Sequence, residues 1–335
     1  MNILAIGDLF IPGKVMDKGL ELLRQKGAKV TVREWEHPSF GELQEDNIII
    51  EQQGPEAVKP PADLTNDIEE YDMIIFQFFP VGKDLIDRAK KLKYIGVLRG
   101  GVENVDCEYA ASKNIEVINT PGRNSRAVAE MTVGLLLAEM RNIARSHYAL
   151  KNNQWRKDYK NKDIIPELLD KTVGVVGYGN VGRLVGRFVK GFGAKVIFYD
   201  PFAKDVSDDA KSVDLETLVK TADMITLNLR LTKESYHLIG EKEISLLKPT
   251  AIVVNTSRSG VIDEKALVKA LQDGKIAGAG LDVFDNEPPP PDDPILALDN
   301  VTITNHCAGT TSESFSNSPN LFAGRFVESH KQLFA

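Results

Sequence analysis

The segment TVGVVGYGNVGRLVGRF, residues 172–188, constrains the fold of this chain more than any other. Residues 172–176 are β-branched or small and apolar, which is typical of a short buried strand. The spacing GxGxxG follows, and the residues after it have the apolar periodicity of an amphipathic helix. Such a turn lets the helix N-terminus bind a pyrophosphate group. The residues assigned to this site are Gly177, Gly179, Asn180, Val181, Gly182 and Arg183.

An acidic residue at the end of the next strand separates this interpretation from a glycine turn with a purely structural role. The strand KVIFYD ends at Asp200, eighteen residues after Gly182. A carboxylate at this place accepts hydrogen bonds from the adenosine ribose hydroxyls and repels the 2′-phosphate of NADP. We therefore predict that the cofactor is NAD and that Asp200 selects it.

Length, charge and cysteine content exclude several classes of protein. At about 150 residues per domain, 335 residues predict two domains. A formal net charge of −7 offers no basic surface for nucleic acid or an anionic membrane. The two cysteines, Cys107 and Cys307, suggest a reducing compartment. The chain opens on an apolar strand rather than a signal peptide, and no apolar run reaches the roughly 18 residues of a membrane helix. We expect a cytoplasmic protein and assign no metal site.

Strands and helices alternate along the chain in two series, which predicts parallel sheets with crossover helices. A long helix is expected between the series, from about Arg126 to Leu150, and it is long enough to cross between domains. The polar segment from about Glu34 to Asn66 is expected to be the least structured. The first series of strands is NILAIG, AKVTVRE, DMIIFQF, KYIGVL and IEVINT, and the second has six strands, TVGVVG, KVIFYD, MITLNL, AIVVNTS, GAGLDV and VTITNH.

Three polar residues lie in separate motifs of the last third of the chain: Arg258 in NTSRSGVIDE, Glu287 in LDVFDNEPPP and His306 in TNHCAGTT. A guanidinium binds a carboxylate bidentately, and an imidazole exchanges a proton near neutral pH. A carboxylate can orient that imidazole and raise its pKa. We assign these three as catalytic. The alternatives are a histidine that merely ends a core strand and a solvated loop glutamate.

The chain resembles the D-isomer-specific 2-hydroxyacid dehydrogenase family from RGGVENVD through NTPGRNSRAVAEMTVGLLLAEMRN and the glycine motif to HCAGTT. The resemblance implies two doubly wound α/β domains with parallel sheets. A Rossmann NAD-binding domain, residues 105–307, would be inserted into a flavodoxin-like substrate domain of residues 1–104 and 308–335. The implied reaction is hydride transfer between a small D-2-hydroxy acid and its 2-oxo acid, with a sugar acid or phosphoglycerate among the candidate substrates.

The resemblance also implies roles for single residues. Arg258 would bind the substrate, Glu287 would pair with the catalytic acid His306, and Asp282 would contact the cofactor carboxamide, with a structural role as the alternative for Asp282. A homodimer, or a dimer of dimers, is implied as well, with an interface at the helix before residue 150 and around Trp155 and Tyr159. An NAD-sensing corepressor is the alternative function, and formate dehydrogenases, which carry glutamine in place of Glu287, are less similar.

Substrate preference depends on the loop after the strand ending at Leu98. Gly100 and Gly101 let backbone N–H groups approach the substrate carboxylate. Arg99 beside them suggests a second anionic group on the substrate, unless Arg99 turns outward to a surface carboxylate. Two departures from the family pattern also bear on specificity. Asn305 replaces a proline before His306, and Arg230 replaces a proline in LNLRLT, which weakens the exclusion of NADP.

Overall fold

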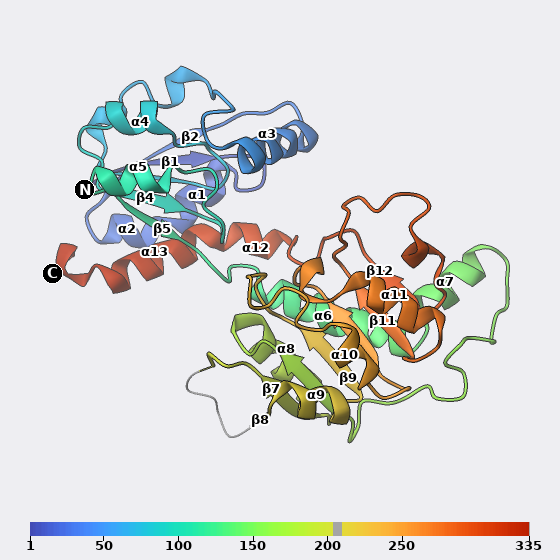
Figure 1. Cartoon of the computed structure of the whole chain (residues 1–335). Coiled ribbons are helices and arrows are strands. Elements are labelled where there is room, and N and C mark those ends of the chain that lie inside the picture. The colour runs from blue at the N-terminus through green and yellow to red at the C-terminus, as the bar shows by residue number, and fades with distance from the viewer. Residues whose placement is uncertain (204–209, 335) are drawn as a thin grey trace. The chain divides into compact units, whose positions relative to one another are not determined.

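The computed structural model describes residues 1–203 and 210–334, which form two compact units (Figure 1). Unit 1 comprises Met1–Asn124 and Thr311–Ala335, and unit 2 comprises Ser125–Thr310. The first predicted boundary, between residues 104 and 105, differs from this by twenty residues. The reason is that α5 (Cys107–Ser112) and β5 (Glu116–Asn119) complete the sheet of unit 1. The second junction lies at 310/311 rather than at 307/308.

Unit 1 is built on a five-stranded sheet in which all pairs are parallel. The order 2-1-3-4-5 is that of the flavodoxin-like doubly wound fold, so this part of the predicted fold class is confirmed. In the order of the sheet, the strands are β2 (Lys29–Glu34), β1 (Asn2–Gly7), β3 (Met73–Phe76), β4 (Tyr94–Val97) and β5.

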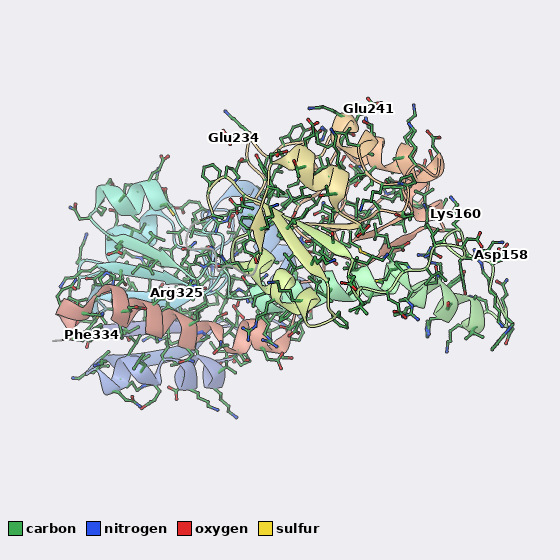
Figure 2. All side chains as sticks on the ribbon, turned by 90° about the horizontal axis from the view of Figure 1, so that it is seen from below. Asp158, Lys160, Glu234, Glu241, Arg325 and Phe334 are labelled. Atoms are coloured by element: carbon green, nitrogen blue, oxygen red, sulfur yellow. The ribbon has the colours of Figure 1, made fainter. Side chains whose placement is uncertain are left out.

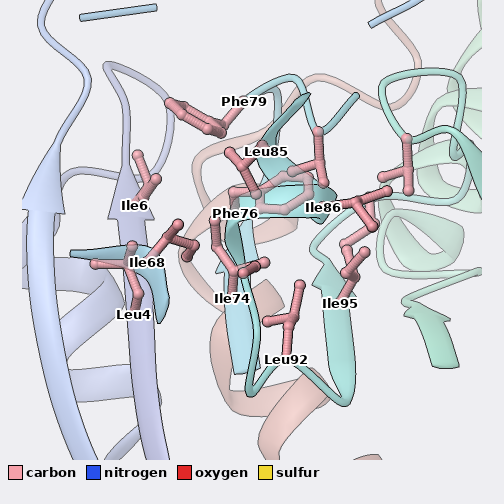
Figure 3. Packing of buried hydrophobic residues seen from close by; sticks show 14 of the residues in the cluster. Leu4, Ile6, Ile68, Ile74, Phe76, Phe79, Leu85, Ile86, Leu92 and Ile95 are labelled. Atoms are coloured by element: carbon pink, nitrogen blue, oxygen red, sulfur yellow. The ribbon is translucent and has the colours of Figure 1, made fainter. Parts of the chain in front are cut away.

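Alternate residues of β1 pack into two cores because successive side chains of a strand point to opposite faces. Ile3 packs with Phe322 and Phe326 of α13 on one face. Leu4 and Ile6 pack with α3 on the other, among the side chains drawn in Figure 3. The helices and short 3₁₀ turns of unit 1 are α1 (Gly13–Gly19), α2 (Glu21–Gln25), α3 (Phe40–Gln53), η1 (Ala62–Leu64), η2 (Ile68–Glu70), α4 (Lys83–Arg88), α5, α12 (Ser312–Ser316), α13 (Ser318–Ser329) and η5 (Lys331–Leu333).

The segment from Glu34 to Asn66 is more ordered than expected, because α3 occupies fourteen of its residues. Ser39 begins this helix by accepting a hydrogen bond from the Glu42 N–H at 3.2 Å, and Gly54 ends it with a φ of 90°. Only Leu43, Asn47 and Ile50 are buried. A helix with so narrow an apolar face has a weak periodic signal in the sequence, which is why it was missed.

Unit 2 is built on a seven-stranded parallel sheet. Counted from its own first strand, the order is 7-6-5-4-1-2-3, which is the Rossmann order 3-2-1-4-5-6 read in reverse with a seventh strand at one edge. The sheet therefore has one strand more than the six predicted. The unpredicted strand is β8, two exposed residues without a periodic pattern. The strands are β12 (Val301–Ile303), β11 (Gly278–Leu281), β10 (Ile252–Asn255), β9 (Met224–Leu227), β6 (Thr172–Val176), β7 (Lys195–Tyr199) and β8 (Lys211–Ser212).

Helices cover both faces of this sheet. On one face α6 (Ser125–Met140) and α8 (Asn180–Lys190) share a core with β6 and β7. The other face carries α9 (Leu215–Thr221), α10 (Glu241–Ser245) and α11 (Glu264–Gln272). The shorter elements are α7 (Ile143–Lys151), η3 (Ser259–Val261) and η4 (Pro294–Ala297). Within residues 1–203 and 210–334, no helix combines the length and apolar character needed to cross a membrane.

The long helix expected from Arg126 to Leu150 is two helices. Its first part ends at Met140, and Asn142 adopts a left-handed conformation with a φ of 57° before α7 begins. The segment after α7 also differs from expectation. Asp158 and Lys160 are labelled in Figure 2. Tyr159, which lies between them in the sequence, is only 8% exposed, and its hydroxyl is hydrogen-bonded to the Ser146 hydroxyl at 2.9 Å. It belongs to the core of unit 2 rather than to an open surface, whereas Trp155 is 80% exposed.

Candidate active site

The glycine turn after β6 has three glycines with different reasons to be glycine. Gly177 has a φ of 89°, and a Cβ there would lie 2.7 Å from Leu229 Cδ2 and 2.8 Å from the Asn228 carbonyl oxygen. A Cβ on Gly182 would overlap the carbonyl oxygen of Gly177. A Cβ on Gly179 would meet no described atom within 4 Å. The first and third glycines are therefore required by packing, and the second borders open space.

That open space lies at the N-terminus of α8. Gly179 precedes the helix and has no side chain to accept a hydrogen bond. The first N–H groups of a helix, here those of Asn180, Val181 and Gly182, have no acceptor within the helix itself, so they suit an anion. Arg183 lies in the same turn, where its Nε donates to the Tyr178 carbonyl oxygen at 3.1 Å and its guanidinium covers the Tyr178 ring. Its contact with a pyrophosphate stays a prediction.

Asp200 follows β7 and faces the same turn. Its Oδ2 accepts a hydrogen bond from the Tyr178 N–H at 2.7 Å, and its Oδ1 accepts one from the Phe202 N–H at 2.8 Å. Each carboxylate oxygen has a further lone pair, so ribose hydroxyls can still bind. The open cradle at Gly179, the helix N-terminus and this carboxylate together fit a dinucleotide.

His306 and Glu287 form a direct pair. The Nδ1 atom of His306 lies 2.6 Å from Oε2 of Glu287, while Oε1 accepts a hydrogen bond from the Phe284 N–H at 3.0 Å. The glutamate is thus held by the backbone of its own loop and orients the imidazole. The His306 side chain is 46% exposed, and Nε2 has no hydrogen-bond partner in the part of the chain that the structure describes. This ring can present Nε2 to a substrate.

Asp282 holds the loop that carries His306. The residue is fully buried, and its Oδ1 accepts hydrogen bonds from Thr304 Oγ1 at 2.5 Å and from the Cys307 N–H at 3.0 Å. Oδ2 accepts one from the Ala308 N–H at 2.8 Å. His306 itself has a φ of 53°, a left-handed conformation that costs free energy for a residue with a side chain. These bonds agree with the structural alternative for Asp282, and its contact with a cofactor stays a prediction.

Arg258 follows β10 and is exposed. Its Nη1 donates to the Ser257 carbonyl oxygen at 2.7 Å. The Asn255 side chain fixes the backbone at this point by donating to the Arg258 carbonyl oxygen at 2.9 Å. Arg258, the Glu287 loop and His306 follow β10, β11 and β12, so they share the carboxyl edge of the sheet with the glycine turn after β6. Ligands of doubly wound folds bind at this edge.

Glu264 is a supporting residue that the sequence did not reveal. The cap of α11 is Asp263, which accepts a hydrogen bond from the Ala266 N–H. Glu264 instead accepts a hydrogen bond from the Asp285 N–H at 3.0 Å, two residues before Glu287. Burial raises the pKa of Glu264. An acidic residue in the first turn of a helix normally indicates a cap, so no signal in the sequence distinguished this role.

Unit 1 holds three of the residues expected to bind substrate, Arg99, Gly100 and Gly101, and Arg99 follows the alternative of pairing with surface carboxylates. Its guanidinium pairs with Glu51 of α3, lies 3.5 Å from Glu103 and donates to Asn47 Oδ1 at 2.9 Å. Arg99 is therefore neutralised by surface carboxylates, which does not support its assignment to substrate binding. Gly100 and the neighbouring Gly101 follow β4 as expected, and their N–H groups donate to no acceptor among the described residues.

Comparisons with known proteins agree with this geometry. Residues 133–308 match the family described as D-isomer specific 2-hydroxyacid dehydrogenase, NAD binding domain. The glyoxylate reductase of Thermococcus litoralis is 40% identical over 254 residues, which cover 74% of this chain and 76% of that protein. The chain belongs to the D-isomer specific 2-hydroxyacid dehydrogenase family.

Two further members of this dehydrogenase family show how far the similarity extends. The D-3-phosphoglycerate dehydrogenase of Methanocaldococcus jannaschii is 42% identical over 282 residues, 81% of this chain. The matched part is only 53% of that relative, so the chain spans about half of its length. The fold matches the NAD-complexed D-isomer specific 2-hydroxyacid dehydrogenase of Lactobacillus delbrueckii ssp. bulgaricus, with a TM-score of 0.77, 24% identity and coverage of 99% of this chain and 98% of that one.

Proposed function

We propose that this member of the family is an NAD-dependent oxidoreductase that interconverts a small D-2-hydroxy acid and its 2-oxo acid. The observation that carries the proposal is the 2.6 Å contact between His306 Nδ1 and Glu287 Oε2. It leaves Nε2 as the proton-transferring atom at the same sheet edge as the nucleotide turn. Reduction of the carbonyl requires a proton donor at this position.

Each residue of the site has a role in this reaction. The nicotinamide of the cofactor, when bound, supplies the hydride. Arg258 binds the substrate carboxylate with its planar guanidinium and polarises the carbonyl. His306 donates the proton from Nε2 to the oxygen on which negative charge develops. Glu287 keeps the ring in position, as the backbone bond to Phe284 in turn fixes Glu287.

The choice of NAD rests on Asp200. Its carboxylate lies beside the nucleotide turn and would repel a 2′-phosphate. Because the relatives reported above are named as enzymes, the dehydrogenase is favoured over the NAD-sensing corepressor. Their names also suggest the substrate class, which would be glyoxylate, hydroxypyruvate or a phosphorylated 2-oxo acid. The cellular location that we propose is the cytoplasm.

We also propose a homodimer in which a second copy of the chain covers α7 and the nearby Trp155. Ile143, Tyr148 and Leu150 of this helix are 55%, 71% and 55% exposed, and Trp155 is 80% exposed. Exposed large apolar side chains gathered in one short segment are typical of protein interfaces. Tyr159 takes no part in this proposal because it is buried within unit 2.

The test is NADH oxidation with glyoxylate, hydroxypyruvate and phosphohydroxypyruvate. The wild type should turn over at least one of these acids. His306→Gln and Arg258→Ala should each lower kcat/KM by about 10²-fold, the loss expected for a positioned acid or a transition-state charge partner. Glu287→Gln should have a milder effect, because the amide oxygen can still accept a hydrogen bond from the ring and orient it. The exposed Arg126→Ala serves as the matched control for Arg258→Ala and should be neutral. Tight NADH binding without turnover of any acid would support the sensor instead.

A further inference from the structure

Arg230 lies in the loop that follows β9, at the carboxyl edge of the unit 2 sheet. β9 pairs with β6, the strand that leads into the glycine turn. The loop packs on that turn, because a Cβ on Gly177 would lie 2.7 Å from Leu229 Cδ2 and 2.8 Å from the Asn228 carbonyl oxygen. The Asn228 N–H also donates to the Val176 carbonyl oxygen at 2.8 Å. Arg230 therefore follows two residues that pack directly against the turn assigned to the dinucleotide.

Hydrogen bonds fix the backbone of this loop. The Ser235 hydroxyl donates to the Arg230 carbonyl oxygen at 2.7 Å and accepts a hydrogen bond from the Thr232 N–H at 2.8 Å. The Tyr236 N–H donates to the Thr232 carbonyl oxygen at 3.0 Å. The N–H of Arg230 donates to no acceptor in residues 1–203 and 210–334. The backbone of Arg230 is thus held through its carbonyl group, and its side chain takes no part in holding the loop.

The side chain of Arg230 is exposed and has no counter-charge within the protein. It forms no ion pair with any carboxylate in the part of the chain that the structure describes. The acidic residue of the same loop, Glu234, is engaged by the Thr232 hydroxyl, whose hydrogen bond lowers the pKa of the Glu234 carboxyl. Binding of an anion by Arg230 would therefore break no internal ion pair.

The other groups beside the glycine turn supply only part of the charge that a pyrophosphate needs. The N-terminus of α8 carries roughly half a positive charge. Arg183 is held by Tyr178, because its Nε donates to the Tyr178 carbonyl oxygen at 3.1 Å and its guanidinium lies 5.5 Å from the centre of the ring. Arg258 follows β10, which is one strand further from β6 than β9. Arg230 thus places an exposed guanidinium on the strand next to the glycine turn.

We propose that Arg230 binds a phosphate of the dinucleotide pyrophosphate. This inference rests on the function proposed above, in which the cofactor is a dinucleotide. A guanidinium suits a phosphate because its donors match two oxygens at once. The pyrophosphate is favoured over an adenosine 2′-phosphate because Asp200 follows β7, on the other side of β6, where its carboxylate would repel a 2′-phosphate. The arginine that replaces a proline in LNLRLT thereby adds a charged contact to the cofactor site.

The test is calorimetric titration of the full-length protein with NADH, ADP-ribose and adenosine, of which only adenosine lacks phosphate. Arg230→Gln should raise Kd for NADH and ADP-ribose about 5- to 20-fold, the scale of lost charge-assisted hydrogen bonds. Its Kd for adenosine should change less than about twofold. NADH binding should also depend less steeply on salt in this variant, because one screened ion pair is missing. Arg230→Pro should match Arg230→Gln, since the Arg230 N–H makes no hydrogen bond that proline would remove, and Arg230→Lys should recover part of the affinity.

Lys233→Gln is the matched control, because it removes an exposed positive charge from the same loop. It should leave all three dissociation constants unchanged. An equal loss for NADH, ADP-ribose and adenosine in Arg230→Gln would overturn the inference, because Arg230 would then only support the loop. Unchanged binding in Arg230→Gln, or an equal loss in Lys233→Gln, would overturn it as well. A greater loss for NADPH than for NADH would show recognition of the 2′-phosphate and would refute the assignment to the pyrophosphate.

Binding and turnover together separate this inference from the proposed function. If the wild type binds NADH, Arg230→Gln loses affinity as expected and no 2-oxo acid is reduced, the inference is supported and the proposed function fails. If a 2-oxo acid is reduced but Arg230→Gln keeps the wild-type Kd, the inference alone is refuted. A wild type that binds neither NADH nor ADP-ribose would refute both.

Discussion

Replacing Asp282 with asparagine should release the loop that carries His306. The carboxylate accepts three hydrogen bonds, two on Oδ1 and one on Oδ2. The amide of asparagine has one accepting oxygen, and its NH₂ group must face at least one of the three donors. In the better orientation the Ala308 N–H is left without an acceptor, and that residue is buried. An unsatisfied buried donor costs about 1–3 kcal/mol.

The two remaining bonds would also weaken in this variant. Hydrogen bonds to a charged group contribute about 1.5–3 kcal/mol and neutral ones about 0.5–1.5 kcal/mol, so each bond loses about 1 kcal/mol. The sum is about 3–5 kcal/mol, an upper bound because the loop can turn its donors to water. The consequence for catalysis follows from the left-handed backbone of His306. Without the bonds that hold it, the ring is misplaced, and a shift of about 1 Å can cost about 10²-fold in rate.

Hydrogen exchange of the backbone amides measures the lost protection in the loop that carries His306. The amides of Cys307 and Ala308 should exchange about 10²-fold faster or more in Asp282→Asn, since each 1.4 kcal/mol of lost protection is a factor of ten. Thr304→Val is the matched control, because it removes a single hydroxyl donor and should cost about 1 kcal/mol. Unchanged exchange together with a KM for NADH raised tenfold or more would refute the reasoning and return Asp282 to the cofactor-binding role implied by the family resemblance.

Three further expectations concern the cofactor, assembly and stability. Wild-type kcat/KM should favour NAD over NADP by about 10²-fold and Asp200→Ala should narrow the ratio; a wild type that prefers NADPH contradicts this. Light scattering should find a dimer that Trp155→Glu weakens, whereas a wild-type monomer at micromolar concentration refutes the interface. Burial raises the pKa of Asp8 to about 6 from 3.8, so the stability from its protonated form is present below about pH 4 and is lost as pH rises through about 6. This amounts to up to about 3 kcal/mol. Urea unfolding of Asp8→Asn should show a flatter pH dependence across that window, and an unchanged slope would contradict the assignment.

Much of the fold could be predicted from the sequence because its signals are local. The apolar strands, the glycine turn and the carboxylate at Asp200 each depend on residues close to one another in the chain. The errors arose where tertiary packing decides. β5 reads as a strand in either domain until its partner β4 is known. α3 has few buried positions, and the break at Asn142 depends on a single left-handed residue.

The same distinction applies to the site. Arg258, Glu287 and His306 were found from motifs and a family resemblance, and the contact between the last two follows from the adjacency of β11 and β12. Partner choice among charges could not be read from the sequence. The pairing of Arg99 with Glu51, for example, joins residues 48 positions apart.

Unit 1 is built from two segments of the chain that are separated by the whole of unit 2, and this has a consequence for synthesis on the ribosome. Phe322 and Phe326 of α13 are fully buried against Ile3 and Ala5 of β1. Until α13 has emerged, that face of the first sheet is covered only in part, by α1 and α2, although its strands left the exit tunnel roughly two hundred residues earlier. Unit 2 is contiguous and can fold first. Part of this face of the N-terminal strands thus stays exposed to aggregation and to chaperones while unit 2 is synthesised, and unit 1 is completed only after unit 2.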